Sequence, residues 1–174
     1  MILVVRKLDV GCGSSKQDGY IGIDILDVEG VDVVWDLEQY PWPFKDNSFD
    51  YIKAFHLIEH LNDQVGFFKE IHRIADNNAI LHIETPHFSS SNSWADPTHV
   101  KHFSVLFTDP ITKGGYLSDA VGCYELVSRR VSFGALFGSI RARLISKIFG
   151  YAQWEKKAFM MPARNIFIDL KVVK

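Results

Sequence analysis

The chain has 174 residues, of which 47% are hydrophobic and 23% are charged, a balance typical of globular rather than disordered proteins. Its formal net charge of −2 gives no electrostatic reason to expect a nucleic-acid partner. The two cysteines, Cys12 and Cys123, have no zinc-finger or redox spacing, and no apolar run reaches the roughly 18 residues of a membrane span. We therefore expect one soluble, cytoplasmic domain over residues 1–174.

The first half of the chain alternates short apolar runs with turn residues. Strands are expected at four places, residues 3–10, 20–25, 31–37 and 49–55. After residue 55 the period changes, and apolar residues recur every three or four positions at Leu57, Leu61, Val65, Phe68, Ile71 and Ile74. This spacing predicts an amphipathic helix within residues 56–78.

The second half contains a long polar and aromatic stretch between further strands. A fifth strand is expected at 79–86, residues 87–122 should be irregular with a short helix after Pro110, and the last strands should occupy 124–133 and 165–173. Alternating strands and helices predict an α/β fold with a mainly parallel, doubly wound sheet covered on both faces. We expect about seven strands, with the last strand antiparallel and the final pair closing one edge.

A glycine loop, DVGCGSSK, follows the first strand. A nucleotide-triphosphate loop would need Gly-Lys-Ser/Thr at its end, which this stretch lacks. A dinucleotide loop would need a third glycine where Lys16 stands, and a long helix where the chain reaches Tyr20 almost at once. A third interpretation remains, in which Gly11 and Gly13 let the backbone approach a ligand closely.

Acidic residues near the strand ends suit that third interpretation. Asp9 can bind an amino group or hold the loop, Asp24 can accept both hydroxyls of a ribose, and Asp36 can accept an adenine amino group. Carboxyl ends of strands in open α/β sheets line one crevice. The set fits an adenosine that carries an amino acid, namely S-adenosylmethionine.

Several motifs in order resemble those of class I S-adenosylmethionine-dependent methyltransferases. They are LDVGCG, GIDI, DLEQYPWPFKDNSFDYIKAFHLIEHL and FFKEIHRIADNNAILHIETP, most similar to the short methyltransferase-domain subgroup with LPFPDNSFD…LEHL patterns. The resemblance covers residues 7–87, the cofactor-binding half, and implies a Rossmann-like fold. It implies a cofactor site made of Asp9, Gly11, Cys12, Gly13, Asp24, Ile25, Asp36, Leu37, His56 and Leu57.

The chain departs from that family in three ways. Ser15 replaces the third glycine, the first helix is nearly absent, and no helices precede the first strand. We therefore expect any lid to come from residues 88–122 and 134–163, which should also contact the substrate.

Histidines are frequent in the region expected to flank the methyl group. His56, His87 and His99 are candidates for a general base, chosen by location. His87, Asp96, His99 and His102 could together hold a metal ion, but their spacing matches no ligand motif, so we expect polar residues that order a loop and no metal.

An apolar helix is expected within the insertion before the last strand. Leu136, Ile140, Leu144, Ile148 and Tyr151 share one face of residues 135–151. We favour a lid packed on its own domain. The alternative is an interfacial helix that contacts a membrane surface or a second copy of the chain.

The expected function is methyl transfer from S-adenosylmethionine to a small-molecule, sugar or lipid-like acceptor. No Asn/Asp-Pro-Pro-Tyr/Phe run follows the fourth strand, which argues against the enzymes that methylate amino groups of nucleic acids. Two alternatives stay open: a non-catalytic cofactor-binding or interaction protein, and a nucleotide-sugar or nicotinamide enzyme.

Overall fold

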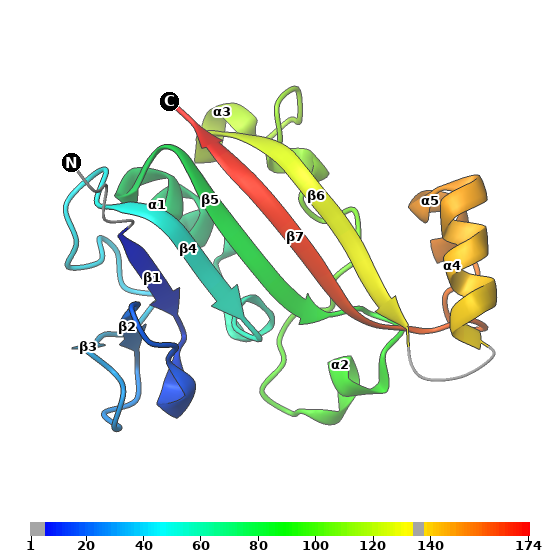
Figure 1. Cartoon of the computed structure of the whole chain (residues 1–174), viewed down its shortest axis with the longest axis horizontal. Coiled ribbons are helices and arrows are strands. Elements are labelled where there is room, and N and C mark those ends of the chain that lie inside the picture. Colours follow the sequence, from blue (N-terminus) through cyan, green and yellow to red (C-terminus); the bar gives the residue numbers. More distant parts are fainter. Residues whose placement is uncertain (1–5, 134–137) are drawn as a thin grey trace.

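The computed structural model describes residues 6–133 and 138–174, which form one seven-stranded sheet (Figure 1). The strand order is β3-β2-β1-β4-β5-β7-β6. The strands are β1 (Lys7–Val10), β2 (Ile21–Asp24), β3 (Val33–Val34), β4 (Phe49–Phe55), β5 (Ala75–Pro86), β6 (Cys123–Phe133) and β7 (Ala163–Val173). Strands β1 to β5 are parallel, and β7 runs antiparallel to both β5 and β6. The predicted Rossmann-like sheet with an antiparallel last strand is confirmed.

The third predicted strand is much shorter than expected. Only Val33 and Val34 pair with β2, and aspartate side chains bind backbone N–H groups on either side of them. Before β3, the Asp32 carboxylate accepts the backbone N–H of Gly22 at 2.7 Å. After it, the Asp36 carboxylate accepts the N–H of Glu38 at 3.0 Å and starts a turn. The first predicted strand begins at residue 3, so its first three residues lie outside the described part of the chain.

The predicted helix after β4 begins later than its apolar period indicates. Helix α1 spans Gln64–Ile74, and the Asp63 side chain caps it by accepting the N–H of Gly66 at 2.8 Å. A short helical turn, Ile58–His60, precedes it and ends at Leu61, whose backbone is extended. The buried face of α1 consists of Phe67, Phe68, Glu70, Ile71 and Ile74, whereas Val65, a predicted face residue, is 37% exposed.

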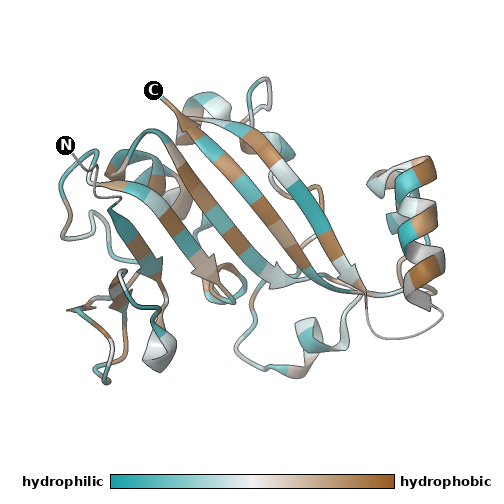
Figure 2. Cartoon of the chain, viewed as in Figure 1, coloured by the Kyte–Doolittle hydropathy of each residue, from teal (hydrophilic) through white to brown (hydrophobic). Residues whose placement is uncertain are grey.

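Helices cover one face of the sheet in the described residues. In Figure 1, α1 and the short α3 (Ser118–Val121) lie behind the strands, and the connections from β1 to β4 contain no helix beyond the single turn Gly13–Ser15. The expected cover on both faces is therefore wrong for this part of the chain. Alternate residues of β5 and β7, such as His82 and Asp169, point to the open face and form a cross-strand pair. Figure 2 shows the resulting alternation of hydropathy along the strands.

The second half adds α2 (Ser91–Ala95), α4 (Gly138–Phe149) and α5 (Tyr151–Glu155). Trp154 of α5 is fully buried and forms a second, small core with Ala158 and Ala163. Glu155 fastens α5 to the loop after β5, because its carboxylate accepts the backbone N–H of Val105 at 2.6 Å and the hydroxyl of Ser104 at 2.7 Å. The imidazole of His87 lies 2.9 Å from the same carboxylate. No helix in the described residues is both long and apolar enough to cross a bilayer.

This anchor makes stability depend on pH. Burial alone would raise the pKa of Glu155, but hydrogen bonds from His87, Ser104 and Val105 outweigh it, so the pKa lies below the usual 4.5. A lowered carboxyl pKa contributes stability above the unfolded pKa and loses it as pH falls through the folded value. We expect Glu155→Gln to lower the free energy of unfolding by about 2 kcal/mol at pH 7. Urea unfolding should show the gap between variant and wild type closing below about pH 4.5, and a gap independent of pH would contradict this role.

Candidate active site

The glycine loop after β1 turns tightly at two left-handed residues. Gly11 has φ +69° and Gly13 has φ +48°, and the Gly11 N–H donates to the carbonyl of Ile23 at 2.8 Å. A Cβ atom on Gly11 would lie 2.8 Å from Cδ1 of Leu57, whereas one on Gly13 would meet no atom within 4 Å. The loop thus packs against the end of β4 and leads into β2 through one helical turn, which explains the short connection.

This difference gives a matched pair of variants. Gly11→Ala combines left-handed strain with a collision at Leu57, and Gly13→Ala adds only the strain, which is about 1–2 kcal/mol. We expect both to fold, with Gly11→Ala melting at the lower temperature and binding S-adenosylhomocysteine more weakly. Calorimetric titration and thermal melting measure the two effects. Equal affinity of the two variants would mean that the Gly11–Leu57 contact does not shape the site.

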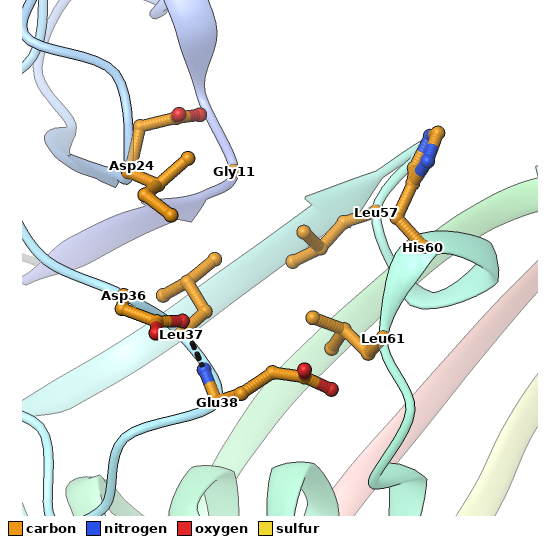
Figure 3. Close-up of a pocket in the computed structure, with 9 residues that line it drawn as sticks. Gly11, Asp24, Asp36, Leu37, Glu38, Leu57, His60 and Leu61 are labelled. Carbon is orange, nitrogen blue, oxygen red and sulfur yellow. Dashed lines mark hydrogen bonds between the residues drawn. The ribbon is translucent and has the colours of Figure 1, made fainter. Parts of the chain in front are cut away.

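Asp24 holds the glycine loop and borders the first cavity (Figure 3). It is 8% exposed, and its two carboxylate oxygens accept the N–H groups of Gly13 at 2.8 Å and Leu26 at 2.9 Å. Each carboxylate oxygen has a second lone pair. The predicted ribose-binding acid therefore lies at the crevice with acceptor capacity left for hydroxyl groups.

The walls of the first cavity are largely apolar. Leu37, Leu57 and Leu61 point toward one another across it in Figure 3, and Asp36 lies at its edge. Its lining residues are Gly11, Asp24, Ile25, Asp36, Leu37, Glu38, Leu57, His60 and Leu61. Apolar walls with a few polar groups at the rim suit a flat heteroaromatic ring that carries a ribose.

Four predicted cofactor residues lie outside this lining: Asp9 and Cys12, which are buried, Gly13 of the glycine loop, and His56, which lines another cavity. Asp9 is 3% exposed, and its Oδ2 lies 2.9 Å from Nζ of Lys53 on β4. Burial raises the pKa of Asp9, and the Lys53 ammonium opposes that shift. Burial, helped by Asp9 and Asp24, raises the pKa of Cys12 to about 11, so this thiol stays protonated at neutral pH.

A second, wider cavity lies beside the first. Its volume is about 430 Å³ against about 230 Å³, and its lining residues are His56, Pro86, Asn92, Ala95, Asp96, Pro97 and His99. The imidazole of His56 is half-exposed, and the hydrogen bond that it donates to the Glu59 carboxylate raises its pKa. The rings of His60 and His99 touch edge to face with centroids 4.7 Å apart, so the two cavities adjoin there.

The structure separates the predicted histidines. His56 and His99 reach the second cavity, whereas His87 is fully buried between Ser89 and Glu155 and lines neither cavity. The ring of His102 stacks on that of Trp94, with the two ring centroids 3.6 Å apart. The lining residues to which the sequence analysis gave no individual role are Glu38, His60, Leu61, Pro86, Asn92, Ala95 and Pro97.

Glu59 lies in the short helical turn Ile58–His60 that precedes α1, and it is 1% exposed. Its Oε2 accepts the hydroxyl of Thr85 at 2.9 Å, and its Oε1 lies 3.3 Å from Nδ1 of His56. The clue available from sequence was position: Glu59 comes four residues after the end of a central strand.

Comparisons with known proteins agree with this geometry. A family described as a methyltransferase domain matches residues 8–83. A S-adenosylmethionine-dependent methyltransferase from Archaeoglobus fulgidus is 21% identical with a TM-score of 0.61, and covers 96% of this chain and 86% of its own. Another from Mesorhizobium loti is 13% identical with a TM-score of 0.57, and covers 96% of this chain and 90% of its own.

A third similar structure, the cyclase SpnF, is 15% identical with a TM-score of 0.62, and covers 97% of this chain and 74% of its own. No curated protein matches the chain. The family match over residues 8–83 and the strand order together show a methyltransferase domain with the Rossmann-like fold of S-adenosylmethionine-dependent methyltransferases. The methyltransferase domain predicted from the motifs of the first half is thereby confirmed.

Proposed function

We propose that the chain holds S-adenosylmethionine in the first cavity and transfers its methyl group to an acceptor in the second. The observation that carries this proposal is the contact between His60 and His99, which joins an apolar cavity with acidic rims to a wider, polar one. Asp24 would accept the ribose hydroxyls, and Asp36 the adenine amino group. The sulfonium is already reactive, so the protein mainly has to bring donor and acceptor to about 3 Å and exclude water.

The lining of the second cavity indicates a polar acceptor group. Asn92, Asp96, His56 and His99 offer both donors and acceptors of hydrogen bonds within a wide mouth. A hydroxylated small molecule, a sugar or the head group of a lipid-like molecule suits such a surface. His87 would need a rearrangement of α5 to contact the acceptor, because Glu155 holds its ring.

Among these acceptors, helix α4 favours a lipid-like molecule. Its side toward β6 is polar, since Arg143, Ser146 and Lys147 line a cavity there with residues of β6. An adjacent stripe of the helix, Ile140, Leu144 and Ile148, is exposed to solvent at 66%, 57% and 62%. This orientation is contrary to the favoured lid, whose apolar side would face the domain. Residue Leu136 of the predicted face lies outside the described part of the chain.

Basic residues beside an exposed apolar stripe suit an anionic lipid surface. Arg143 and Lys147 flank the stripe, and Lys156 and Lys157 are exposed just after α5. We propose that α4 rests on such a surface and brings an amphiphilic acceptor near the second cavity. A second copy of the chain is the other occupant that the stripe allows.

Vesicle binding tests this contact. We expect the chain to float with vesicles that contain phosphatidylserine and not with phosphatidylcholine alone, and Leu144→Glu to abolish flotation. Lys113→Glu, at another exposed basic position, should leave flotation unchanged. The lipid proposal would be overturned if the chain does not float. A second copy would be favoured if sedimentation then shows a dimer and Leu144→Glu dissociates it.

A structure with S-adenosylhomocysteine tests the proposed reaction. We expect the adenine between Leu37 and Leu61, and the sulfur atom facing the cavity of His56 and His99. A sulfur atom that faces away from the second cavity would contradict methyl transfer there. It would favour a protein that uses the fold without that reaction, an alternative suggested by the similar fold of the cyclase SpnF.

A further inference from the structure

Three metal-binding side chains meet where the two cavities adjoin, although the sequence analysis expected no metal. Glu59 and His60 come from the helical turn after β4, and His99 comes from the loop after α2. Their ligand atoms lie within 4.8 Å of one another. The backbone N–H groups of Val100 and Lys101 donate to the Glu59 carbonyl at 2.9 and 3.2 Å. The loop is thus held against the turn by the protein itself.

Hydrogen bonds orient both imidazoles. Nδ1 of His99 lies 3.0 Å from the carbonyl oxygen of Ser93. A carbonyl only accepts, so Nδ1 carries the proton and Nε2 keeps its lone pair. Apart from Asp96 Oδ2 at 3.9 Å, no charged group pairs with Nε2 in the described part of the chain. Histidines that bind metals usually donate their other N–H to a carbonyl or carboxylate in this way.

His60 is oriented by the same rule. Its Nδ1 lies 3.3 Å from the carbonyl of Thr98 and 3.0 Å from the Thr98 hydroxyl. That hydroxyl donates its proton to Asp96 at 2.6 Å, so it accepts from His60. Nδ1 of His60 therefore carries the proton, and Nε2 is free to bind a ligand. The Asp-Pro-Thr-His stretch gains a role: Asp96 and Thr98 orient one imidazole, and His99 supplies the other.

Glu59 contributes a buried negative charge. Its side chain is 2% exposed, yet among the described residues no lysine or arginine pairs with it, and its partners are Thr85 and His56. A buried carboxylate is costly unless it is paired or coordinates a metal. A cation between Glu59 and the two imidazoles would balance this charge.

We infer that Glu59, His60 and His99 bind one divalent transition-metal ion, with Zn²⁺ as the best match. Two imidazoles and one carboxylate form a recurrent set in catalytic zinc sites, which keep a fourth position open. Zinc binds imidazole nitrogens at about 2.0–2.1 Å and carboxylate oxygens at about 2.0–2.2 Å. The three ligand atoms lie within 4.8 Å of one another, so binding would draw them closer around the ion.

This inference extends the proposed function by naming the acceptor class. The open position would take an oxygen of the acceptor in the second cavity, and the metal would lower the pKa of that hydroxyl. The hydroxyl proton leaves to water, the oxygen forms a bond to the methyl carbon as the carbon–sulfur bond breaks, and S-adenosylhomocysteine departs. The acceptor is thus an oxygen nucleophile.

Metal titration tests the site without any assay of methyl transfer. The chain, stripped of metal by a chelator, is titrated with Zn²⁺ by calorimetry and with Co²⁺ by visible absorption. We expect one ion per chain and tetrahedral Co²⁺ bands. His60→Gln and His99→Gln should each weaken binding by well over tenfold, and Thr98→Val, which removes an orienting hydroxyl, by about 10–100-fold.

His102→Gln is the matched control. His102 lies in the same loop but hydrogen-bonds Ser93 and stacks on Trp94, outside the cluster. It should keep wild-type affinity, and melting curves should show that all four variants fold. The inference is overturned if wild type binds no Zn²⁺, if both ligand variants still bind it, or if His102→Gln loses it equally. Binding of S-adenosylhomocysteine in the presence of chelator separates failure of the metal site from failure of the cofactor site.

Discussion

Lys53→Met should lower the free energy of unfolding by about 3–5 kcal/mol, because it leaves a buried carboxylate without its partner. Lys53 and Asp9 have side chains 5% exposed each, and 2.9 Å separates their charged atoms. The ammonium also lies 4.9 Å from the ring of Tyr20 and 5.1 Å from that of Phe55. These contacts join β1, the chain before β2, and β4 beneath the glycine loop.

Lys171→Met is the control for this variant. Lys171 pairs with Glu125 on the open face, where the two side chains are 33% and 39% exposed, so the loss should stay below about 1 kcal/mol. Urea unfolding of both variants gives the comparison. The Lys53→Met defect should also shrink toward acid pH, because the raised pKa of Asp9 lets the folded state take up a proton before the unfolded state does. Equal losses in the two variants would mean that the Asp9–Lys53 pair is no stronger than a surface pair.

Asp24→Asn should weaken binding of S-adenosylhomocysteine by about 10–100-fold, since hydrogen bonds to a charged group contribute about 1.5–3 kcal/mol. The amide keeps the size of the side chain and one acceptor oxygen. The melting temperature of the Asp24→Asn variant should fall slightly, because Asp24 also accepts the N–H groups of Gly13 and Leu26. Calorimetric titration of the folded variant measures the affinity.

Asp27→Asn provides the comparison, because Asp27 is an exposed acid three residues further on and outside the cavity lining. It should bind the ligand as wild type does. Unchanged affinity of Asp24→Asn would limit Asp24 to holding the loop. Equal weakening in both variants would instead indicate a general effect of charge.

The hydropathy pattern of the sequence predicted correctly those strands whose bounds depend on neighbouring residues. The bounds of β4 agree with the expected residues 49–55, and β6 and β7 form the expected edge pair. The start of α1 could not be read in the same way. Leu57 and Leu61 continue its apolar period because they line the first cavity, while the backbone at Leu61 is already extended.

Contacts between distant segments account for what the sequence did not reveal in the site. His60 and His99 are far apart in the chain. Their rings meet because Val100 and Lys101 donate to the Glu59 carbonyl and His60 hydrogen-bonds Thr98. Amphipathic spacing likewise predicted a helix around α4, but not which side of that helix faces the sheet. Arg143, Ser146 and Lys147 of α4 line a cavity together with Val131 and Phe133 of β6, an arrangement that the spacing does not indicate.

The open face of the sheet changes what each strand has to provide. Strands of parallel sheets enclosed by helices are usually apolar on both sides. Here β5 and β7 form the boundary between water and the protein interior, so every second residue must be compatible with solvent. His82, Asp169 and Lys171 meet that demand on one side while Ile83, Ile168 and Leu170 fill the core on the other. The long strands of this chain therefore present polar side chains directly to water, whereas surface helices do so in fully covered relatives of the fold.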